Sequence, residues 1–515
     1  MIKTNAGKIL SLIAVLTVMI TSFIGLSVTA SAATSVHYGL TQKNGTIMLN
    51  GKPYYSMGVN LYDAFLVYLR GSSDQNHVEK EFKQLKESKI PVARISMCGY
   101  NSSEFNDYME YKDFYFSCID KVIGYAEKYQ IGIVFDLCWA IDAIPDYVWA
   151  YRSDIGDANG EVVKTAKKYV ADVVTRYKNS PAVWAWEIGN EYNLDCDLAG
   201  VVTRTEKEDV SSDDVHVYYE QLAKVIRSID SYRLITGGDS EPRTSAYNLY
   251  KNNSWQLDTY EEMASMMKKL SPSPMNMMSV HVYQDGDNSE KGAGSINENM
   301  IEDFDAQVKN YMKAAADAGQ ALFVGEFGIM ERTCASADVA KKILRGQYDA
   351  FMKHGVQLSC IWVYGKDDND PMNISPTNNL AYQYNMIVNG NVRYRNEGKQ
   401  DSASYWSSAK NLVYKKSTTT TKAVTKPKTT GKATNTAATQ TGSAASASTD
   451  NESTANESFT TAGSSETGTS ITAKDTDTDP GNSSLLWIII GCGAVVVVIA
   501  CGITFVILKK KKLSH

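Results

Sequence analysis

The sequence lacks the patterns that mark several protein classes. No Cys-x-x-Cys pair occurs among its 8 cysteines, and its 6 histidines are scattered, so neither a zinc site nor a disulfide-stapled mini-domain is indicated. No Gly-x-Gly-x-x-Gly motif or phosphate-binding loop follows an apolar run, which argues against nucleotide-binding folds. The net charge is -6, so the basic excess that favours nucleic acid as a partner is also missing. We expect no metal and no cofactor.

Aromatic residues are missing from one long part of the chain. Seven of the 8 tryptophans precede residue 407, and Phe459 is the only aromatic residue between Tyr414 and Trp487. Residues 417–484 consist mainly of Thr, Ser, Ala, Gly and Lys, which cannot offset the entropy cost of ordering. We therefore predict a disordered, flexible stalk there.

Both ends of the chain carry long apolar runs. The first ends in a small-x-small pattern and predicts an export signal over residues 1–32, with an uncleaved signal anchor as the alternative. Residues 485–508 are apolar and uncharged, long enough for one transmembrane helix, and the basic tail 509–515 places that end in the cytoplasm. We therefore predict a single-pass protein of the cell membrane, with residues 33–416 outside the cell.

Residues 33–416 alternate between two kinds of pattern. Short apolar runs rich in β-branched and aromatic residues predict strands, and helical periodicity fills most of the intervals. The runs are continuous rather than alternating, which is typical of parallel strands buried on both faces. Eight such units indicate an α/β fold, a (β/α)8 TIM barrel in a single catalytic domain, and we expect a monomer. The predicted strands are Tyr54–Val59, Val92–Ser96, Ile131–Leu137, Val183–Ile188, Arg233–Gly237, Met277–Tyr283, Leu322–Phe327 and Leu358–Val363.

Two segments outside these strands carry predictions of their own. Gly45–Lys52 contains an Asn-Gly turn and predicts a hairpin that caps one end of the barrel. Gly365–Lys399, after the last strand, is expected to be the longest strand-end loop. Its tyrosines, Tyr382, Tyr384 and Tyr394, are expected to form a wall of the cleft.

Two predicted strands lead into a glutamate. The fourth continues to Asn190-Glu191, and the seventh carries Glu326 after a glycine. In a parallel barrel the chemistry lies at the C-terminal ends of the strands. Two carboxylates that face each other across a sugar meet the requirement of glycoside hydrolysis, because one protonates the leaving oxygen while the other attacks the anomeric carbon or activates water. A single strand-end glutamate is as well explained by an ion pair or a helix cap; the pair favours catalysis.

The order of these motifs resembles clan A glycoside hydrolases, most of all family 5, the cellulase and mannanase group. The resemblance covers residues 37–414 and implies retention of anomeric configuration, with Glu191 as general acid/base and Glu326 as nucleophile. It implies that an arginine keeps the nucleophile ionised, that an asparagine binds the sugar 2-hydroxyl, and that a tryptophan lies under the reacting sugar. The substrate-binding residues implied in this way are Arg94, Asn190, His281, Tyr283 and Trp362.

Two further expectations concern the surroundings of these residues. Family members commonly carry histidine at the end of the third strand, where this chain has Cys138-Trp139, so we expect Trp139 to take over part of the sugar contact. Glu191 faces an anionic neighbour with no evident cation of its own. We therefore expect its pKa to be raised, so that it keeps its proton.

The predicted function is hydrolysis of β-glycosidic bonds in a β-linked polysaccharide, of the β-1,4-glucan or β-mannan type, by double displacement outside the cell. Two alternatives stay open: a catalytically silent carbohydrate receptor on the same scaffold, and a transglycosylase that uses the same residues. Glucan and mannan, and endo and exo cleavage, are not separated by the sequence.

Overall fold

The computed structural model describes residues 37–72, 74–198, 209–283, 300–366 and 370–410. The predicted export signal, stalk, transmembrane helix and basic tail lie outside these residues. Among the described residues, every helix is too short or too polar to cross a membrane.

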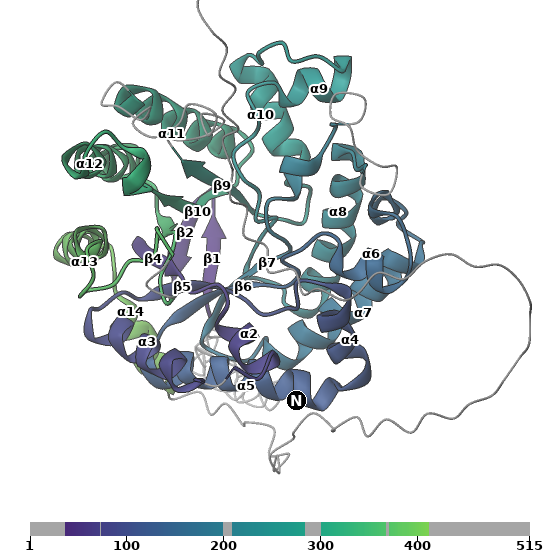
Figure 1. Cartoon of the computed structure of the whole chain (residues 1–515), viewed down its shortest axis with the longest axis horizontal. Helices are drawn as coiled ribbons and strands as arrows, with labels where there is room; N and C mark the ends of the chain where they lie inside the picture. Colours follow the sequence, from purple (N-terminus) through teal and green to yellow (C-terminus); the bar gives the residue numbers. More distant parts are fainter. Residues whose placement is uncertain (1–36, 73, 199–208, 284–299, 367–369, 411–515) are drawn as a thin grey trace, which may run out of the picture. The chain divides into compact units, whose positions relative to one another are not determined.

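Eight parallel strands form a near-closed barrel surrounded by helices (Figure 1). Neighbouring strands pair in the order β8-β7-β6-β5-β4-β11-β10-β9. The two end strands meet through Asn276, which accepts from the backbone nitrogen of Ile235 at 2.9 Å and donates its own backbone N–H to the Ile235 oxygen at 3.3 Å. The predicted TIM barrel is thus confirmed. Its strands are β4 (Ser56–Asn60), β5 (Val92–Ser96), β6 (Gly132–Asp136), β7 (Val183–Glu187), β8 (Leu234–Thr236), β9 (Met277–Tyr283), β10 (Ala321–Gly328) and β11 (Leu358–Ile361).

Helices cover the outside of the barrel, and shorter helices lie within the connections that follow its strands (Figure 1). Capping fixes their ends: in α12, the Ser336 side chain accepts from the Val339 backbone, and Gly355 ends the helix in the left-handed conformation. The helices that the sequence predicted are α3 (Asn76–Glu87), α5 (Lys112–Tyr129), α7 (Glu161–Tyr177), α8 (Ser212–Ile229), α11 (Met300–Asp317) and α12 (Ala337–His354). Further helices are α2 (Ala64–Leu69), α4 (Ser102–Glu110), α6 (Ala143–Tyr147), α9 (Ala246–Asn252), α10 (Tyr260–Lys269), α13 (Ala381–Asn396) and α14 (Ser402–Lys410), with 3-10 helices η1 (Arg152–Gly156), η2 (Tyr192–Asp195) and η4 (Glu331–Thr333).

A small antiparallel sheet of β1 (Leu40–Lys43), β2 (Thr46–Leu49) and β3 (Lys52–Pro53) precedes the barrel. Its two turns are Asn44-Gly45 and Asn50-Gly51, whose residues all have positive φ, as type I′ turns require. The Ile47 backbone donates to the side chain of Gln357, just before β11, at 2.8 Å. The predicted hairpin at one end of the barrel is therefore confirmed, and the structure places it at the N-terminal end of the strands.

The interior is filled by continuous apolar packing. Strands β4 to β7 are buried at every residue, in agreement with the unbroken apolar runs of the sequence. Gly132 opens β6 because a Cβ there would lie 1.9 Å from the Trp184 indole. The six described cysteines are free and buried: Cys98, Cys118, Cys138, Cys196, Cys334 and Cys360.

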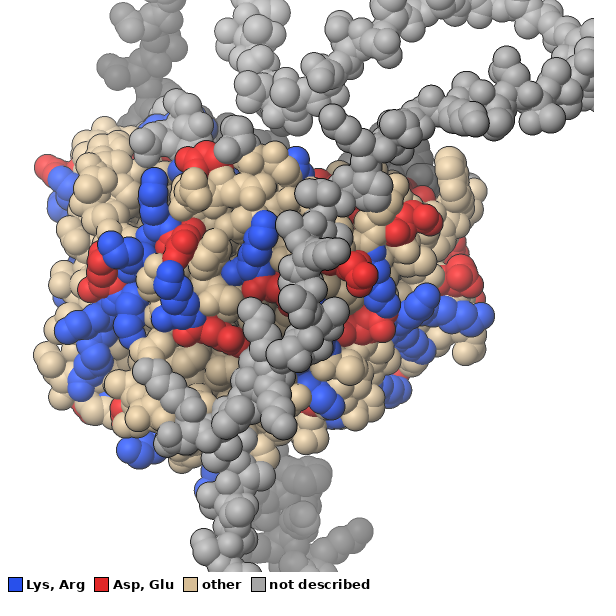
Figure 2. Space-filling model, turned by 90° about the horizontal axis from the view of Figure 1, so that it is seen from below, with Lys and Arg blue, Asp and Glu red and all other residues tan. Residues whose placement is uncertain are grey.

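Charged side chains of both signs are interspersed on the face shown in Figure 2. One-turn ion pairs occur on the helices: Arg345 pairs with Asp349 at 3.0 Å on α12, and Arg393 of α13 pairs with Glu397 at 2.8 Å. Exposed pairs of this kind contribute little stability individually. The face in Figure 2 is mixed in charge rather than broadly basic.

The segment after β11 differs from the prediction. It contains helix α13, which packs beside β4 through Asn391, whose side-chain amide donates to the Met57 backbone at 2.7 Å. Tyr384 and Tyr394 are 0% and 3% exposed, and their hydroxyls donate to Ser88 Oγ and to the Val356 carbonyl. The expectation that these two tyrosines line a cleft is wrong, because they pack in the outer layer of the barrel.

Candidate active site

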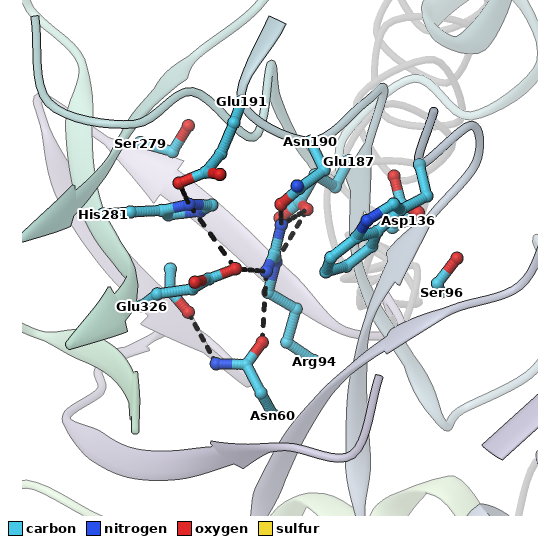
Figure 3. Close-up of polar contacts among 12 residues, drawn as sticks. Asn60, Arg94, Ser96, Asp136, Glu187, Asn190, Glu191, Ser279, His281 and Glu326 are labelled. Carbon is cyan, nitrogen blue, oxygen red and sulfur yellow. Dashed lines mark hydrogen bonds and ion pairs between the residues drawn. The ribbon is translucent and has the colours of Figure 1, made fainter. Parts of the chain in front are cut away.

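The C-terminal ends of the strands bring the polar residues of the barrel together (Figure 3). Parallel strands all end at one rim, so side chains that are distant in the sequence converge there. Six strands contribute to this cluster, which consists of Asn60 on β4, Arg94 on β5, Asp136 on β6, Glu187 on β7, His281 and Tyr283 on β9, and Glu326 on β10, with Asn190 and Glu191 just after β7.

Arg94 is the centre of the cluster and is fully buried. Its Nη1 donates to Glu326 Oε1 at 2.7 Å, and its Nη2 lies 2.6 Å from Glu187 Oε1. The same guanidinium donates to Asn190 Oδ1 at 2.7 Å and to Asn60 Oδ1 at 3.1 Å (Figure 3). One fixed cation therefore holds two carboxylates and two amides, which only the planar fork of arginine can do.

Both oxygens of Glu326 are held. Arg94 binds Oε1, and the Tyr283 hydroxyl donates to Oε2 at 2.7 Å. The Nδ1 atom of His281 is 3.5 Å from Oε1. His281 and Tyr283 both reach Glu326, in agreement with the two-residue spacing that places their rings on one face of β9. The carboxylate is thus fixed in one orientation at the strand end.

Glu191 has a different environment from the one that we expected. Its backbone is left-handed, with φ 56°, and its Oε1 lies 2.9 Å from His281 Nδ1. Burial raises the pKa of Glu191, but the hydrogen bond from His281 and the charges of His281 and Arg94 outweigh burial, so the pKa lies below its usual value. The expected rise is therefore wrong for the free protein, because the sequence did not show that His281 lies within hydrogen-bond distance of Glu191.

Glu191, His281 and Glu326 each place one ligand atom within 4.8 Å of the other two. Three such atoms could hold a metal ion. The oxygen of Glu326 nearest to His281 is, however, already bound by Arg94, and a guanidinium at 2.7 Å competes with a second cation for that oxygen. The chemistry of the cluster fits two positioned carboxylates better than a metal centre, and the absence of a metal stays a prediction.

A row of aromatic rings lies beside the carboxylates. Trp362 stacks on Tyr62 with ring centroids 4.8 Å apart, and Trp139 lies 5.3 Å from Tyr62 and 5.5 Å from Tyr100. The Trp139 ring is also 4.8 Å from the guanidinium carbon of Arg94. The structure therefore brings Trp139 and Trp362 to the site, as expected, and adds Tyr62 and Tyr100, which follow the first and second barrel strands.

The sequence-based prediction missed other polar residues of the cluster. Glu187 and Asp136 are fully buried at the ends of β7 and β6. Burial and the neighbouring charge of Glu187 raise the pKa of Asp136 to about 7, although Arg94 opposes this rise. The sequence did carry a signal for Glu187 and Asp136, because burying an acid inside an unbroken apolar strand costs free energy unless the acid has a partner. Asn60, which ends β4, carried no comparable signal.

A parallel barrel whose strands β7 and β10 lead into two facing carboxylates belongs to the class of glycoside-cleaving barrel enzymes. The comparison with known families is specific. The chain belongs to the cellulase family, glycosyl hydrolase family 5, whose model matches residues 50–368, more than half of the chain.

Individual relatives are distant. The chain is 21% identical over 342 residues to a probable mannan endo-1,4-beta-mannosidase F of Aspergillus flavus, covering 62% of this chain and 65% of the relative, a little under two thirds of its length. It is 24% identical over 315 residues to mannan endo-1,4-beta-mannosidase A of Hypocrea jecorina, covering 56% and 62%. Among solved structures, the endo-1,4-beta-mannanase from Rhizomucor miehei matches with a TM-score of 0.53 and 19% identity, over 69% of this chain and 99% of that one. This structural likeness shows the fold.

Proposed function

We propose that this chain is a retaining glycosidase that hydrolyses β-1,4-linked polysaccharide, with Glu326 as nucleophile and Glu191 as general acid/base. The observation that carries the proposal is the separation of the two carboxylates, whose nearest ligand oxygens lie within 4.8 Å. Retaining glycosidases place the two groups about 5–5.5 Å apart, whereas inverting enzymes need about 6.5–9.5 Å to admit a water molecule. The short separation supports double displacement.

In the first step, a carboxylate oxygen of Glu326 attacks the anomeric carbon while the bond from that carbon to the leaving oxygen breaks. Arg94 and Tyr283 hold the carboxylate in place for this attack. Glu191 gives its proton to the leaving oxygen and becomes a carboxylate, which lies at hydrogen-bond distance from His281 Nδ1. The product is a glycosyl ester on Glu326 and a released sugar chain.

In the second step, the Glu191 carboxylate takes a proton from water, and the resulting oxygen attacks the anomeric carbon of the ester. Glu326 leaves as a carboxylate, and the anomeric configuration is restored. Arg94 accepts this charge without rearrangement because it already binds Glu326 in the free protein. Asn190, whose Oδ1 accepts from Arg94, donates through its other amide atom to the sugar 2-hydroxyl. Trp362 and Trp139 contact the bound sugar with their rings.

Mannan is the substrate favoured by the relatives. Both curated relatives described above are named as mannan endo-1,4-beta-mannosidases, and the solved structure is an endo-1,4-beta-mannanase. A panel of mannan, cellulose, mixed-linkage glucan, xyloglucan and xylan tests this choice. Release of reducing sugar from mannan above all other polymers is the expected result.

Conservative replacement of each carboxylate tests the mechanism. In the full chain, Glu326→Gln and Glu191→Gln should each reduce reducing-sugar release by about 10³-fold or more, because each acts in both chemical steps. Proton NMR of the first product formed by the wild-type chain should show the retained anomer. An inverted product contradicts double displacement. Binding of polymer without turnover identifies a silent receptor, and longer products in the presence of added oligosaccharide identify a transglycosylase.

We also propose that the enzyme works at the outer face of the cell membrane. The support is in the sequence, where the apolar run 485–508 is followed by four lysines. Cell fractionation should find the full chain with membranes and a chain ending at residue 484 in the medium. Activity in the cytosolic fraction alone contradicts this location.

A further inference from the structure

Every donor of the Arg94 guanidinium is already in use. Its Nε donates to Glu187 Oε1 at 2.7 Å, and its Nη2 lies 2.6 Å from the same oxygen. Nη2 also donates to Asn190, and Nη1 donates to Asn60 and Glu326 (Figure 3). These contacts occupy all the N–H groups that a guanidinium carries. Arg94 therefore has no donor left for another buried acceptor.

Glu187 keeps one oxygen without a donor. Both of its contacts with Arg94 fall on Oε1. The side chain is fully buried, and its Oε2 has no hydrogen-bond partner among the residues that the structure describes. A buried carboxylate oxygen that lacks a donor costs free energy. Since Arg94 has no further N–H to offer, a donor for Oε2 has to come from a neighbour.

Asp136 is that neighbour. Strands β6 and β7 pair in parallel with Asp136 opposite Glu187, and residues paired in this way point to the same side of the sheet. Asp136 is also fully buried. Its hydrogen-bond partners are uncharged: the Cys138 backbone nitrogen at 3.4 Å, the Cys98 thiol at 3.6 Å and the Ser96 hydroxyl. Asp136 thus lies beside a buried carboxylate and makes no ion pair of its own.

The charges around Arg94 favour a proton on one of these acids. Arg94 already binds the carboxylates of Glu187 and Glu326, and Asp136 adds a third acid near the same cation. Burial and the charge of Glu187 raise the pKa of Asp136 to about 7, so Asp136 keeps its proton at weakly acid pH. A protonated carboxyl group carries one O–H donor, which is the group that Glu187 Oε2 lacks.

The other titratable groups that face the two acids are mostly uncharged near neutral pH, because burial raises the pKa values of their thiols and phenols. Asp239, after β8, is the exception among the described residues: burial raises its pKa to about 7, and it also faces His281 on β9. A titration near neutral pH therefore has to be assigned between two aspartates. The uncharged groups are Cys98 and Tyr100 after β5, Cys138 after β6, Tyr219 on α8 and Cys360 on β11.

We infer that Asp136 and Glu187 share one proton beneath Arg94, and that this acid pair positions the nucleophile Glu326 through Arg94. While the proton is held, the Asp136 hydroxyl donates to Glu187 Oε2, and Glu187 holds Arg94 where it also binds Glu326. Loss of the proton removes the donor and places a second negative charge against Glu187. The two acids then repel each other, and the guanidinium shifts with Glu187. The inference rests on the proposed function, because attack by Glu326 depends on its placement.

Asp136→Asn tests the pair in the full chain, since an amide cannot ionise but still donates to Glu187 Oε2. The substrate is a dinitrophenyl β-glycoside, whose leaving group departs without a proton, so the protonation of Glu191 does not shape kcat/KM. In the wild type, kcat/KM should fall about tenfold between about pH 6 and pH 8, as expected for one group with a pKa of about 7. In Asp136→Asn it should stay within about twofold over the same range.

Asp239→Asn is the matched control. It makes the same change at the other buried aspartate, which accepts from the Tyr219 hydroxyl at 2.9 Å. Its kcat/KM should fall with pH as in the wild type. A fall that disappears in Asp239→Asn and remains in Asp136→Asn overturns the inference, and so does a fall that all three chains share. A wild-type profile that is level from about pH 6 to pH 8 overturns it as well.

Carbon-13 NMR titration of labelled aspartate gives a readout that does not depend on turnover. The Asp136 signal, identified by its loss in Asp136→Asn, should titrate near pH 7 in the wild type. In Glu187→Gln it should titrate at lower pH, because the charge that raises this pKa is lost and the new amide donates to the carboxylate. That shift also identifies the signal if Asp136→Asn does not fold.

The same titration separates failure of this inference from failure of the proposed function. If the wild-type chain cleaves no β-glycan, the proposed function fails. An aspartate signal that titrates near neutral pH and moves in Glu187→Gln still supports the shared proton in that case. An Asp136 signal that is ionised throughout the neutral range, or that does not respond to Glu187→Gln, contradicts it.

Discussion

His281 holds Glu191 through a contact of 2.9 Å between its Nδ1 and the glutamate Oε1. The same nitrogen is 3.5 Å from Glu326 Oε1, so one imidazole lies between the two carboxylates of the proposed reaction. Burial raises the pKa of Glu191, and the hydrogen bond and charge of His281 lower it, so the proposed proton donor depends on its contact with His281.

Replacement of His281 by glutamine should raise the pKa of Glu191. Burial, which raises this pKa, remains in the variant, whereas the hydrogen bond and the charge of His281, which lower it, are lost. Carbon-13 NMR titration of labelled glutamate measures the shift, and the signal that disappears in Glu191→Gln identifies the residue. We expect kcat to fall by about 10²-fold or more. An unchanged pKa means that His281 does not control the protonation of Glu191.

Replacement of Arg94 by methionine should destabilise the barrel strongly. Glu187 and Glu326 would remain buried without their cation, and breaking a buried ion pair in this way costs about 3–5 kcal/mol. Urea unfolding measures the loss. A second substitution, Glu187→Gln, removes one of the two buried carboxylates that lack a cation and should restore part of the stability without restoring activity. No recovery in the double variant argues that packing, rather than charge, explains the loss.

The parts of the site that the sequence predicted are those set by strand geometry. Arg94, Tyr283 and Glu326 converge because parallel strands end at one rim and alternate residues share a face. The contact of Glu191 with His281 depends instead on the left-handed backbone of Glu191, which no pattern indicates.

Helix α13 was missed although its signal was available. Its inward residues include Tyr384, Ile387, Asn391 and Tyr394, which recur at helical spacing. The polar and acidic residues around them suggested a loop. The buried face of α13 became evident only through its packing beside β4.

Two glycine-to-alanine substitutions should act in opposite directions. At Gly132 a Cβ would lie 1.9 Å from the Trp184 indole, so Gly132→Ala overpacks the barrel and should cost about 1–3 kcal/mol or more. At Gly124, within α5, a Cβ meets no described heavy atom within 4 Å, so Gly124→Ala should stabilise the helix by about 0.5–1 kcal/mol. Thermal unfolding of both variants measures the difference. Equal melting temperatures would show that the Trp184 ring moves aside at no cost.

Asp239 should make the stability of the barrel depend on pH. It is 8% exposed, accepts from the Tyr219 hydroxyl at 2.9 Å, and burial raises its pKa to about 7 from about 4 in the unfolded chain. Between these values the unfolded chain releases the proton while the folded chain keeps it, so stability falls as pH rises from about 4 to about 7. Asp239→Asn removes this loss. The difference in melting temperature between the variant and the wild type should therefore grow in the variant's favour through that pH range and stay constant at higher pH. Asp338→Asn, at a side chain 85% exposed, is the control and should follow the wild type. A constant difference between Asp239→Asn and wild type at every pH shows that Asp239 is ionised in the folded chain throughout.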